Sequence, residues 1–558
     1  MQFLALPFEL RYSPLTLSAS GALVFAALAA IFPGWALFYV LLALVCAALL
    51  LLGIHDLRQT RHAILRNYPI TGHLRFMLEG FRPEIRQYFF EGDKDGAPFP
   101  RDKRAIVYQR AKKDLDKRPF GTQYDVYEEQ YEWLHHSLAP QPLADDSAYR
   151  VTIGHPGPCK APYSASVLNI SAMSYGALSA NAIRALNRGA KLGGFAHDTG
   201  EGAVSPYHRE FGGDLIWEIG SGYFGCRAAD GGFDPARFAE AAADPQIRMV
   251  ELKLSQGAKP GHGGVLPAAK VTPEISAIRG VPMGADCVSP ARHSAFATPV
   301  ELLEFVALMR DLSGGKPAGF KLCIGHTWEF MAICKAMLET GITPDFIVID
   351  GKEGGTGAAP LEFMDHVGMP LRDGLTFVHN ALVGIGMRDR IRLGASGKII
   401  SAFDMARVMA LGADWCNAAR GFMFAVGCIQ AQTCHTGLCP TGVTSQDPLR
   451  QRAIVVPDKA ERVLNFHRNT VHALGELVAA AGLDHPGALE PHHFLRRGAS
   501  DRVESYAEQY EILAPGQLLA DPGSSRRYAE AWRLSQAHSF ARIDTTNRAT
   551  GDLKPVAV

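Results

Sequence analysis

Three cysteines lie close together in the run that begins at Gly427, and their spacing is the strongest chemical feature of this chain. Five residues separate Cys428 from Cys434, four separate Cys434 from Cys439, and Pro440 follows at once. Three thiolates in one short loop suit an iron–sulfur cluster better than a disulfide, which would leave one thiol over. Because no fourth cysteine is near, the spacing favours a three-iron cluster with one thiolate per iron. The alternative is three buried structural cysteines, since free cysteine is often a small core residue.

Glycine-rich segments follow three of the strands that the sequence predicts. They are Asp350–Gly357, which contains Gly354 and Gly355, then Gly394–Lys398, which contains Gly397, and Ala418–Gly421, which contains Arg420. Backbone N–H groups exposed by glycine can approach phosphate oxygens closely, and a helix N-terminus adds a favourable field. The segments therefore predict a cofactor that carries a phosphate. The alternative is that each glycine only makes a tight turn.

Charged residues occupy other strand ends. Glu201 follows one predicted strand, and Lys253 lies near the end of another. Lys253 alternates with apolar residues in its strand, and Lys321 has the same surroundings in another strand. Both side chains are therefore expected to point into the sheet interior. A buried lysine is costly unless an anion offsets its charge. A structural salt bridge is the alternative for each lysine taken alone, but two lysines at one mouth favour a ligand.

Short apolar runs alternate with helical periodicity from about residue 165 to about 425. The predicted strands are Val167–Ile170, Phe195–His197, Met249–Leu254, Phe320–Ile324, Phe346–Ile349, Ile391–Leu393 and Trp415–Asn417, and the predicted helices include Ser179–Leu192, Pro299–Leu312, Trp328–Glu339 and Phe403–Leu411. This alternation predicts a parallel sheet, and its length fits an α/β fold of the (β/α)8 TIM barrel type with an eighth strand inside 214–224. A doubly wound open sheet is the alternative. No G-x-G-x-x-G pattern opens any unit, which counts against a Rossmann cofactor site.

Two uncharged stretches, Leu15–Phe32 and Trp35–Ile54, precede this region. Each is near the roughly 20 residues needed to cross a hydrocarbon core, and Pro33-Gly34 between them indicates a turn. We therefore expect a transmembrane helical hairpin. Arg11 before it and Arg58 after it place both ends, and the catalytic domain, on the cytoplasmic side of the inner membrane. A signal peptide and a buried core hairpin are the alternatives.

The composition of the chain limits the expected partners and the expected compartment, and changes in composition along it indicate domain boundaries. The 558 residues carry 56 acidic and 56 basic side chains, so no basic field exists to hold nucleic acid. Seven scattered cysteines indicate a reducing compartment. We expect the hairpin at residues 1–55, a juxtamembrane connector at 56–150, the barrel with its cysteine loop at 151–455, and a C-terminal helical extension at 456–558. Basic clusters of the connector are expected either to be solvated or to contact anionic lipid heads.

Five segments, in the same order, resemble the FMN-binding domain of glutamate synthases. They are Ser171–Ala177, Thr199–Gly202, Gln256–Gly261, Gly354–Ala358 and Cys428–Val443. The resemblance covers about half of the chain and points to stand-alone glutamate synthase-like proteins with a membrane hairpin. It implies a barrel that binds FMN and a [3Fe-4S] cluster on the three cysteines that passes electrons to the flavin. It also implies hydride transfer to 2-iminoglutarate, made from 2-oxoglutarate and ammonia.

The resemblance assigns residues position by position. It implies flavin contacts from Ala172, Met173, Ser174, Lys253, Gln256 and Lys321, with Lys321 at the isoalloxazine edge, and cofactor or phosphate contacts from Gly354, Gly355, Gly397, Arg420 and Gly421. Lys259 and Arg279 match cations that bind the oxoacid carboxylates, a role suited to fixed ammonium and guanidinium donors. Glu201 matches an acid beside the substrate that positions it or transfers a proton.

Departures from the family pattern affect the expected substrate. Val265 stands where glutamate synthases have glutamine, and His262 replaces an acidic residue. The chain opens Met1-Gln2 instead of a nucleophilic cysteine, and the glutaminase, β-helix and NAD(P)H-binding domains have no counterpart. Nitrogen is then expected from free ammonia, an amine or a partner subunit, and electrons from a ferredoxin-like donor or a reductase subunit. A homo-oligomer and a monomer are both compatible with the sequence.

Three hypotheses remain. The first is a membrane-tethered FMN and iron–sulfur oxidoreductase that makes or oxidises a C–N bond in a 2-oxoglutarate-type acid. The second keeps the cofactors but takes another substrate, such as an N-substituted glutamate, and the third is an electron-transfer flavoprotein without amination. Lys259 and Arg279 favour the first two, because a pure electron carrier needs no carboxylate-binding cations. Val265 and His262 favour the second over the first.

Overall fold

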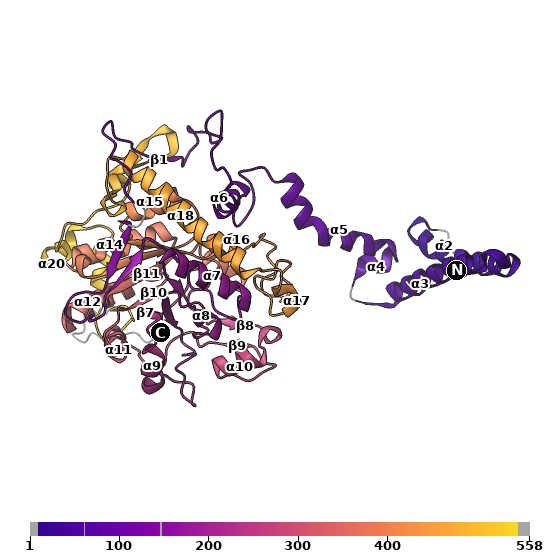
Figure 1. The fold of residues 1–558 in the computed structure, drawn as a ribbon, viewed down its shortest axis with the longest axis horizontal. Coiled ribbons are helices and arrows are strands. Elements are labelled where there is room, and N and C mark those ends of the chain that lie inside the picture. Colours follow the sequence, from indigo (N-terminus) through magenta and orange to yellow (C-terminus); the bar gives the residue numbers. More distant parts are fainter. Residues whose placement is uncertain (1–8, 61, 146–147, 545–558) are drawn as a thin grey trace. The chain divides into compact units, whose positions relative to one another are not determined.

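The computed structural model describes residues 9–60, 62–145 and 148–544, so Met1 and Gln2 lie outside the described residues. The chain divides into two units, Met1–Arg101 and Asp102–Val558. Figure 1 shows the elements of both. Each unit is described by itself.

The first unit contains two apolar helices that pack against each other. They are α2 (Ser13–Ile31) and α3 (Ala36–Arg58), joined through a 3-10 turn at Pro33–Trp35. Gly21 allows the close approach, because a methyl group there would lie 2.9 Å from Cys46 Sγ. The helical segments Leu10–Ile31 and Pro33–Arg58 are long and apolar enough to cross a membrane, and little of their surface is buried. This confirms the two predicted apolar helices. Three further elements complete the unit, namely α4 (Ala63–Asn67), α5 (Thr71–Ile85) and a π-helical turn η4 (Arg86–Phe90).

The second unit is built on a closed barrel of eight parallel strands. In chain order they are β4 (Leu168–Ile170), β5 (His197–Asp198), β6 (Leu215–Ile219), β7 (Ile247–Lys253), β10 (Ala318–Leu322), β11 (Phe346–Asp350), β12 (Arg392–Ser396) and β13 (Trp415–Ala418). Neighbours along the chain are neighbours in the barrel, which closes where β13 pairs with β4. The predicted barrel is confirmed, including the eighth strand inside 214–224, and the open doubly wound sheet is excluded.

Helices surround the barrel strands (Figure 1). They include α7 (Ala180–Gly193), α8 (Pro206–Arg209), α9 (Pro235–Ala242), α11 (Pro299–Leu312), α12 (Thr327–Thr340), α13 (Leu361–His366), α14 (Leu371–Gly384), α15 (Ala402–Ala410) and α16 (Arg420–Ala425). Many begin with clear caps: Ser179 accepts a hydrogen bond from the N–H of Ala182, and Thr298 and Glu301 form a capping box at the start of α11. The helices that the sequence predicts are present, and their first and last residues agree with the predicted ones to within one or two residues.

The amino-terminal end of the barrel is closed by apolar residues. A hairpin of β2 (Arg150–Ile153) and β3 (Tyr163–Ser166) contributes Ile153 and Tyr163 to a core cluster with Ile216, Met249 and Trp415 of the strands. Alternate residues of a strand point to the same side, so Glu218 and Glu251 follow Ile216 and Met249 toward the carboxyl-terminal end. Charge therefore gathers at the end where barrel enzymes carry their chemistry.

Segments on both sides of the barrel in sequence cover it. Helix α18 (Val456–Ala480) packs along α7, α15 and α16. The chain before the barrel includes α6 (Arg101–Lys112), whose Lys103 forms an ion pair with Asp404 at 2.9 Å. The remaining elements are β1 (Glu132–Leu134), which pairs with β14 (Phe494–Arg497), then β15 (Val503–Ser505), the short β8–β9 pair (Val265–Leu266 and Cys287–Val288), α10 (Pro273–Arg279), α17 (Pro448–Gln451), α19 (Tyr506–Gln509), α20 (Gln517–Ala520) and α21 (Tyr528–Leu534).

Candidate functional site

The carboxylate of Glu201 stands at the mouth of the barrel, in the loop that follows β5. Its Oε2 lies 3.1 Å from the ammonium nitrogen of Lys253, the last residue of β7. Two glycines leave room for this side chain: a methyl group on Gly264 would lie 2.0 Å from Glu201 Oε1, and one on Gly220 would lie 2.6 Å from Oε2. The glycines therefore fix the position of the carboxylate.

Arg279, the last residue of α10, lies against the loop that follows β4. Its Nη2 donates to the carbonyl oxygen of Tyr175 at 2.8 Å and to the hydroxyl of Ser174 at 3.4 Å. Its Nε is buried and has no hydrogen-bond partner among the described residues. A methyl group on Gly202 would lie 2.7 Å from Nη2, so that glycine is needed for the approach. These contacts hold the guanidinium in place, and its Nε–H group is left as a donor without a partner among the described residues.

Lys259 is a buried cation, with 2% of its surface exposed. Within the described part of the chain its ammonium makes no hydrogen bond and no ion pair shorter than 4 Å. Burial lowers the pKa of Lys259, and the field of Glu201 acts in the opposite direction. The ammonium nitrogen is not among the fully buried atoms that lack a partner, so it reaches the open mouth of the barrel, where it is available to an anionic ligand.

The charges at the mouth do not balance. Burial alone would raise the pKa of Glu201, but Lys253, followed by Arg279 and Lys259, holds that pKa below its usual range. Three cations against one carboxylate leave two positive charges. This surplus matches a ligand with two carboxylates, and it favours the carboxylate-binding role that the sequence predicts for Lys259 and Arg279.

Inside the barrel, Lys321 of β10 is enclosed by carboxylates. Its Nζ pairs with Glu218 of β6 and lies 3.2 Å from Glu251 Oε1 of β7. Oxygen atoms of Asp198, Glu218 and Glu251 all lie within 4.8 Å of one another. Burial, acting against the field of Lys321, raises the pKa of Glu251 to about 7, and burial also raises the pKa of Asp198. Lys321 and Lys253 therefore both form salt bridges, and the flavin contacts expected of them stay predictions.

The three glycine-rich segments leave adjacent strands, because β11, β12 and β13 are neighbours in the barrel. Arg420, after β13, donates from Nη2 to the carbonyl oxygen of Thr356 at 2.8 Å. A methyl group on Gly355 would lie 3.1 Å from Arg420 Nε, so this glycine allows the loops to meet. Gly397 has φ +153°, a conformation that favours glycine, and a methyl group there would lie 3.2 Å from Leu371.

The remaining predicted positions fall around the same mouth. Met173 is buried in the loop after β4, and a methyl group on Gly200 would lie 2.6 Å from the backbone N of Ser174, so the β4 and β5 loops touch. Ala172 precedes them at half-burial. The carbonyl oxygen of Gln256 accepts the N–H of Lys259 at 3.3 Å. Gly354 packs on the backbone of Gly351, and Gly421 packs on Phe466, with methyl groups at either glycine 3.0 Å from these neighbours.

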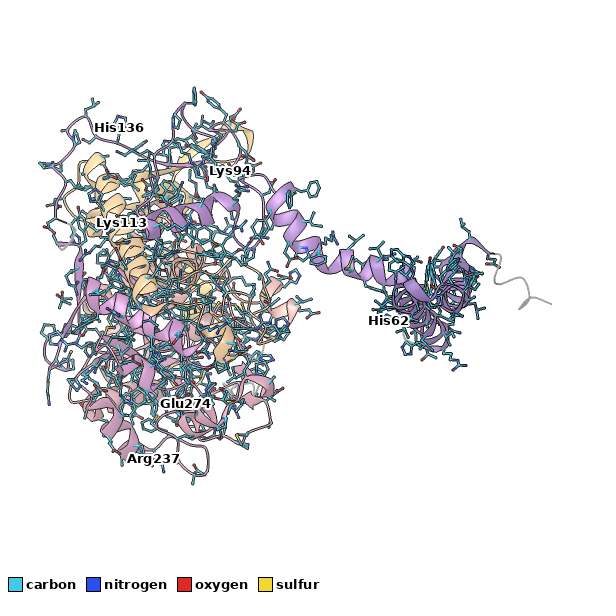
Figure 2. The ribbon with its side chains drawn as sticks, turned by 45° about the vertical axis from the view of Figure 1, so that its right-hand side comes forward. His62, Lys94, Lys113, His136, Arg237 and Glu274 are labelled. Carbon is cyan, nitrogen blue, oxygen red and sulfur yellow. The ribbon has the colours of Figure 1, made fainter. Side chains whose placement is uncertain are left out.

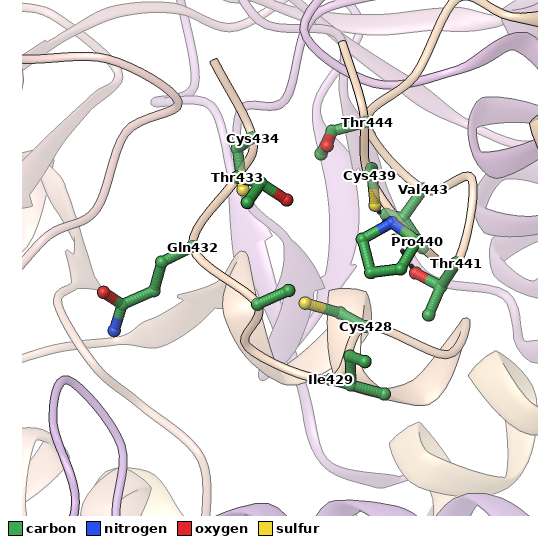
Figure 3. A pocket seen from close by; sticks show the side chains of 11 residues that line it. Cys428, Ile429, Gln432, Thr433, Cys434, Cys439, Pro440, Thr441, Val443 and Thr444 are labelled. Carbon is green, nitrogen blue, oxygen red and sulfur yellow. Dashed lines mark hydrogen bonds between the residues drawn. The ribbon is translucent and has the colours of Figure 1, made fainter. Parts of the chain in front are cut away.

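The three cysteines surround one cavity in the loop after α16. Figure 3 shows the sulfurs of Cys428, Cys434 and Cys439 approaching it from different sides. Among the described residues, the group whose ligand atoms all lie within 4.8 Å of one another is the carboxylate set, so at least one pair of these sulfurs is more than 4.8 Å apart. The cluster on the three cysteines therefore stays a prediction from the sequence.

The surroundings of the sulfurs differ. Burial raises the pKa of Cys428 to about 11. Burial acts in the same direction on Cys439, but hydrogen bonds from the Thr441 hydroxyl and from backbone N–H groups hold the pKa of that thiol below its usual value. The hydroxyl of Tyr108, from α6, donates to the carbonyl oxygen of Cys428 at 2.7 Å. The segment before the barrel thus supports the cysteine loop.

Comparison with known proteins identifies the family. A family model described as a conserved region in glutamate synthase matches residues 113–484. The chain belongs to the glutamate synthase family. It is 36% identical over 500 residues to the glutamate synthase large subunit-like protein YerD of Bacillus subtilis (strain 168), which covers 82% of this chain and 94% of that protein.

Other glutamate synthases match over a shorter part. The archaeal-type glutamate synthase (NADPH) of Thermotoga maritima is 34% identical over 59% of this chain and 62% of its own length. The glutamate synthase (NADPH) large chain of Azospirillum brasilense is 30% identical over 64% of this chain, but this is 22% of the large chain. Among solved structures, a mutant flavocytochrome b2 with pyruvate bound aligns at a TM-score of 0.39 and 11% identity, over 80% of this chain and 91% of that one. The family is one of oxidoreductases.

This glutamate synthase-like site contains residues that the sequence pattern did not reveal. Lys270 donates from Nζ to the carbonyl oxygens of Ala177 at 2.9 Å and Cys434 at 3.3 Å, so it joins the β4 loop to the cysteine loop. His293 lies 2.8 Å from the carbonyl oxygen of Lys253. Glu274, labelled in Figure 2, accepts the hydroxyl of Tyr175 at 2.6 Å. A lone lysine, histidine or glutamate in a loop carries no motif, so only the fold could place them.

Proposed function

We propose that this protein is a membrane-tethered glutamate synthase-like oxidoreductase that uses FMN and a [3Fe-4S] cluster to reduce an imino acid with two carboxylates. The observation that carries the proposal is the surplus of two positive charges around Glu201, including the unpaired ammonium of the largely buried Lys259. A barrel that only transferred electrons would have no reason to bury a cation in this way. Family membership supports the same class of reaction.

The residues present fit both cofactors. For FMN, the adjoining glycine loops after β11, β12 and β13 expose backbone, and Arg420 supplies a cation beside Gly355. For the cluster, three sulfurs from one short loop line one cavity, which supplies one thiolate for each iron of a three-iron cluster. When bound, FMN supplies hydride transfer and the cluster supplies single electrons.

The side chains at the mouth have separate tasks in this proposal. Lys259 and Arg279 bind the two carboxylates, and Arg279 is pre-positioned by its hydrogen bonds to the β4 loop. Lys253 keeps Glu201 ionised, so that Glu201 can hold the protonated imino nitrogen while hydride adds to the carbon, or can accept the proton of the substrate ammonium in the reverse direction. His293 fixes the backbone of Lys253 from behind. Fixed donors of this kind hold a substrate in a reactive orientation.

A second candidate substrate follows from the turn at 260–265. Val265 pairs with Val288 in the short β8–β9 sheet, and His262 lies 2.9 Å from the carbonyl oxygen of Gly263 through its own Nδ1. The turn thus offers neither the amide nor the carboxylate that glutamate synthases carry there. An N-substituted glutamate, oxidised at its C–N bond, is the alternative substrate. The proposal also includes inner-membrane location with a cytoplasmic barrel and an electron donor that is a ferredoxin-like protein or a reductase subunit.

Cofactor content is the first experiment. After anaerobic purification we expect FMN and about three iron atoms per chain. Cys434→Ser should lose iron and keep FMN, whereas Cys416→Ser, a buried cysteine of β13 away from the loop, should keep both. Absence of FMN, or iron content that is the same in both variants, would contradict the proposal.

Substrate choice is the second experiment. The enzyme is photoreduced and mixed with 2-oxoglutarate and ammonium, and flavin reoxidation is followed by its visible absorbance. An N-substituted glutamate is tested in the opposite direction, with the oxidised enzyme. If 2-oxoglutarate with ammonium does not speed flavin reoxidation, and the N-substituted glutamate does not speed flavin reduction, the proposal is wrong. The third hypothesis, a flavoprotein without amination, then replaces it.

A further inference from the structure

An apolar stripe runs along α5 and the turn that follows it, and nothing described covers it. Its residues are Leu74, Met77, Leu78, Phe81, Ile85 and Phe89, which recur every three or four residues apart from the adjacent pair Met77-Leu78, with between 39% and 80% of each exposed. That spacing places them on one face of a helix. Soluble proteins rarely leave a continuous apolar face of this length in water, so the stripe indicates an interaction surface.

One flank of the same helix, about a quarter turn from the stripe, is charged. Arg75, Arg82 and Arg86 lie seven and four residues apart along this flank, and Arg75 pairs with Glu79 at 2.7 Å. So many charges exclude α5 as a span of the bilayer core. An apolar face flanked by arginines and ending in the aromatic run Tyr88–Phe90 is typical of a helix that lies in the headgroup layer.

The start of α5 is fixed to the end of α3. Asp56, in the last turn of α3, is fully buried and accepts the N–H of Ile70 at 2.9 Å, and His73 Nε2 lies 2.9 Å from its Oδ1. Ile70 has φ +67°, a strained conformation for a branched residue, and it packs near Gly53 of α3. Since α3 is apolar up to Ile54, α5 begins where that span meets the membrane surface.

From these contacts we propose that α5 and η4 lie in the headgroup layer of an anionic bilayer, with the stripe toward the acyl chains and the arginines toward lipid phosphates. This proposal rests on the membrane hairpin of the proposed function. The occupant is lipid because the stripe continues from the apolar hairpin and because its arginine flank complements anionic headgroups. A second copy of the chain, or the barrel unit, is a competing occupant that the experiment separates.

Photocrosslinking of the full-length protein in vesicles tests the proposal. p-Benzoylphenylalanine is placed at Phe81 on the stripe, at Glu79 on the charged side, and at Leu44 in α3. Vesicles contain phosphatidylcholine alone or with phosphatidylglycerol, and adducts are identified by mass spectrometry. We expect lipid adducts at Phe81 to exceed those at Glu79 at least fivefold, and to rise severalfold with phosphatidylglycerol. Arg82→Gln combined with Arg86→Gln should remove that rise.

Each other outcome overturns the proposal. Cross-links from Phe81 to a second copy or to the barrel unit, or equal lipid labelling at Phe81 and Glu79, would show that the stripe serves another purpose. The Leu44 probe separates the two proposals: lipid labelling there without labelling at Phe81 keeps the hairpin and refutes the headgroup helix. Absence of labelling at Leu44 would refute the hairpin itself.

Discussion

Replacing Lys259 with methionine should make the substrate-free protein more stable against unfolding and should weaken its binding of substrate. Lys259 as a residue is 2% exposed, and its ammonium has no partner within 4 Å among the described residues. Holding an unpaired charge in a largely buried position is unfavourable, although contact with solvent and the field of Glu201 return a part of that cost. Methionine fills a similar volume without that cost, so we expect a gain of about 1 kcal/mol or more in the free energy of unfolding.

The same substitution should weaken substrate binding. A hydrogen bond to a charged group contributes about 1.5–3 kcal/mol, and each 1.4 kcal/mol is tenfold in affinity. Lys259→Met should therefore raise KM for a dicarboxylate substrate by about 10- to 150-fold. Glu201 keeps its ion pair with Lys253, so FMN content and the ionisation of Glu201 should stay as they are.

Lys321 is the matched control, because it is equally buried but paired. Lys321→Met leaves Glu218 and Glu251 without their cation, and breaking a buried pair costs about 3–5 kcal/mol. Thermal and denaturant unfolding of the FMN-loaded proteins, without substrate, measures both variants under the same conditions. If Lys259→Met destabilises the protein as Lys321→Met does, Lys259 is a structural cation, and the reasoning from its missing partner is wrong.

Two further predictions concern Glu201 and the carboxylates inside the barrel. Gly264→Ala must push the Glu201 carboxylate by about 1.4 Å to restore ordinary contact from 2.0 Å, so kcat should fall about 100-fold while FMN is retained. Gly80→Ala in α5, outside the barrel unit, meets open space and is the control in the same steady-state assay. Glu251, with its pKa raised to about 7, stabilises the fold fully below about pH 4.5 and loses that contribution as pH rises to 7. Glu251→Gln should flatten this fall by on the order of 2 kcal/mol in urea unfolding across that range, and an unchanged pH profile would place the titration elsewhere.

The repeating pattern of the sequence was enough to predict the barrel. Strands such as Phe346–Asp350 are almost continuous apolar runs, which is what burial on both faces of a parallel sheet requires, and the capping box of Thr298 and Glu301 stands where the predicted helix Pro299–Leu312 begins. The strand that contains Glu218 was only placed within 214–224, because this glutamate interrupts its apolar run. The carboxylate partner of Lys321 was therefore not predicted.

Pairing across loops could not be predicted in the same way. Lys253 and Lys321 have the same pattern in sequence, yet one pairs with Glu201 at the mouth and the other with Glu218 and Glu251 inside. These partners lie 52 to 103 residues away along the chain, and only closure of the barrel brings them together. The cysteines differ, because all three belong to one short segment, and the structure brings them to one cavity without any pairing across the barrel.

The loop after β4 links the substrate site to the cysteine loop through its backbone. The carbonyl oxygen of Tyr175 accepts from Arg279, that of Ala177 accepts from Lys270, and those of Gly176 and Leu178 accept from the Gln446 amide at 3.0 and 2.9 Å. Lys270 also donates to the carbonyl oxygen of Cys434. Four consecutive carbonyls are thus held by the side chains of Arg279 at the end of α10, Lys270 just before α10 and Gln446 beyond the cysteines. A shift of the cysteine loop would be passed to Arg279 through this one stretch of backbone. Under the proposed function, the geometry of the cluster and that of carboxylate binding would therefore be set together.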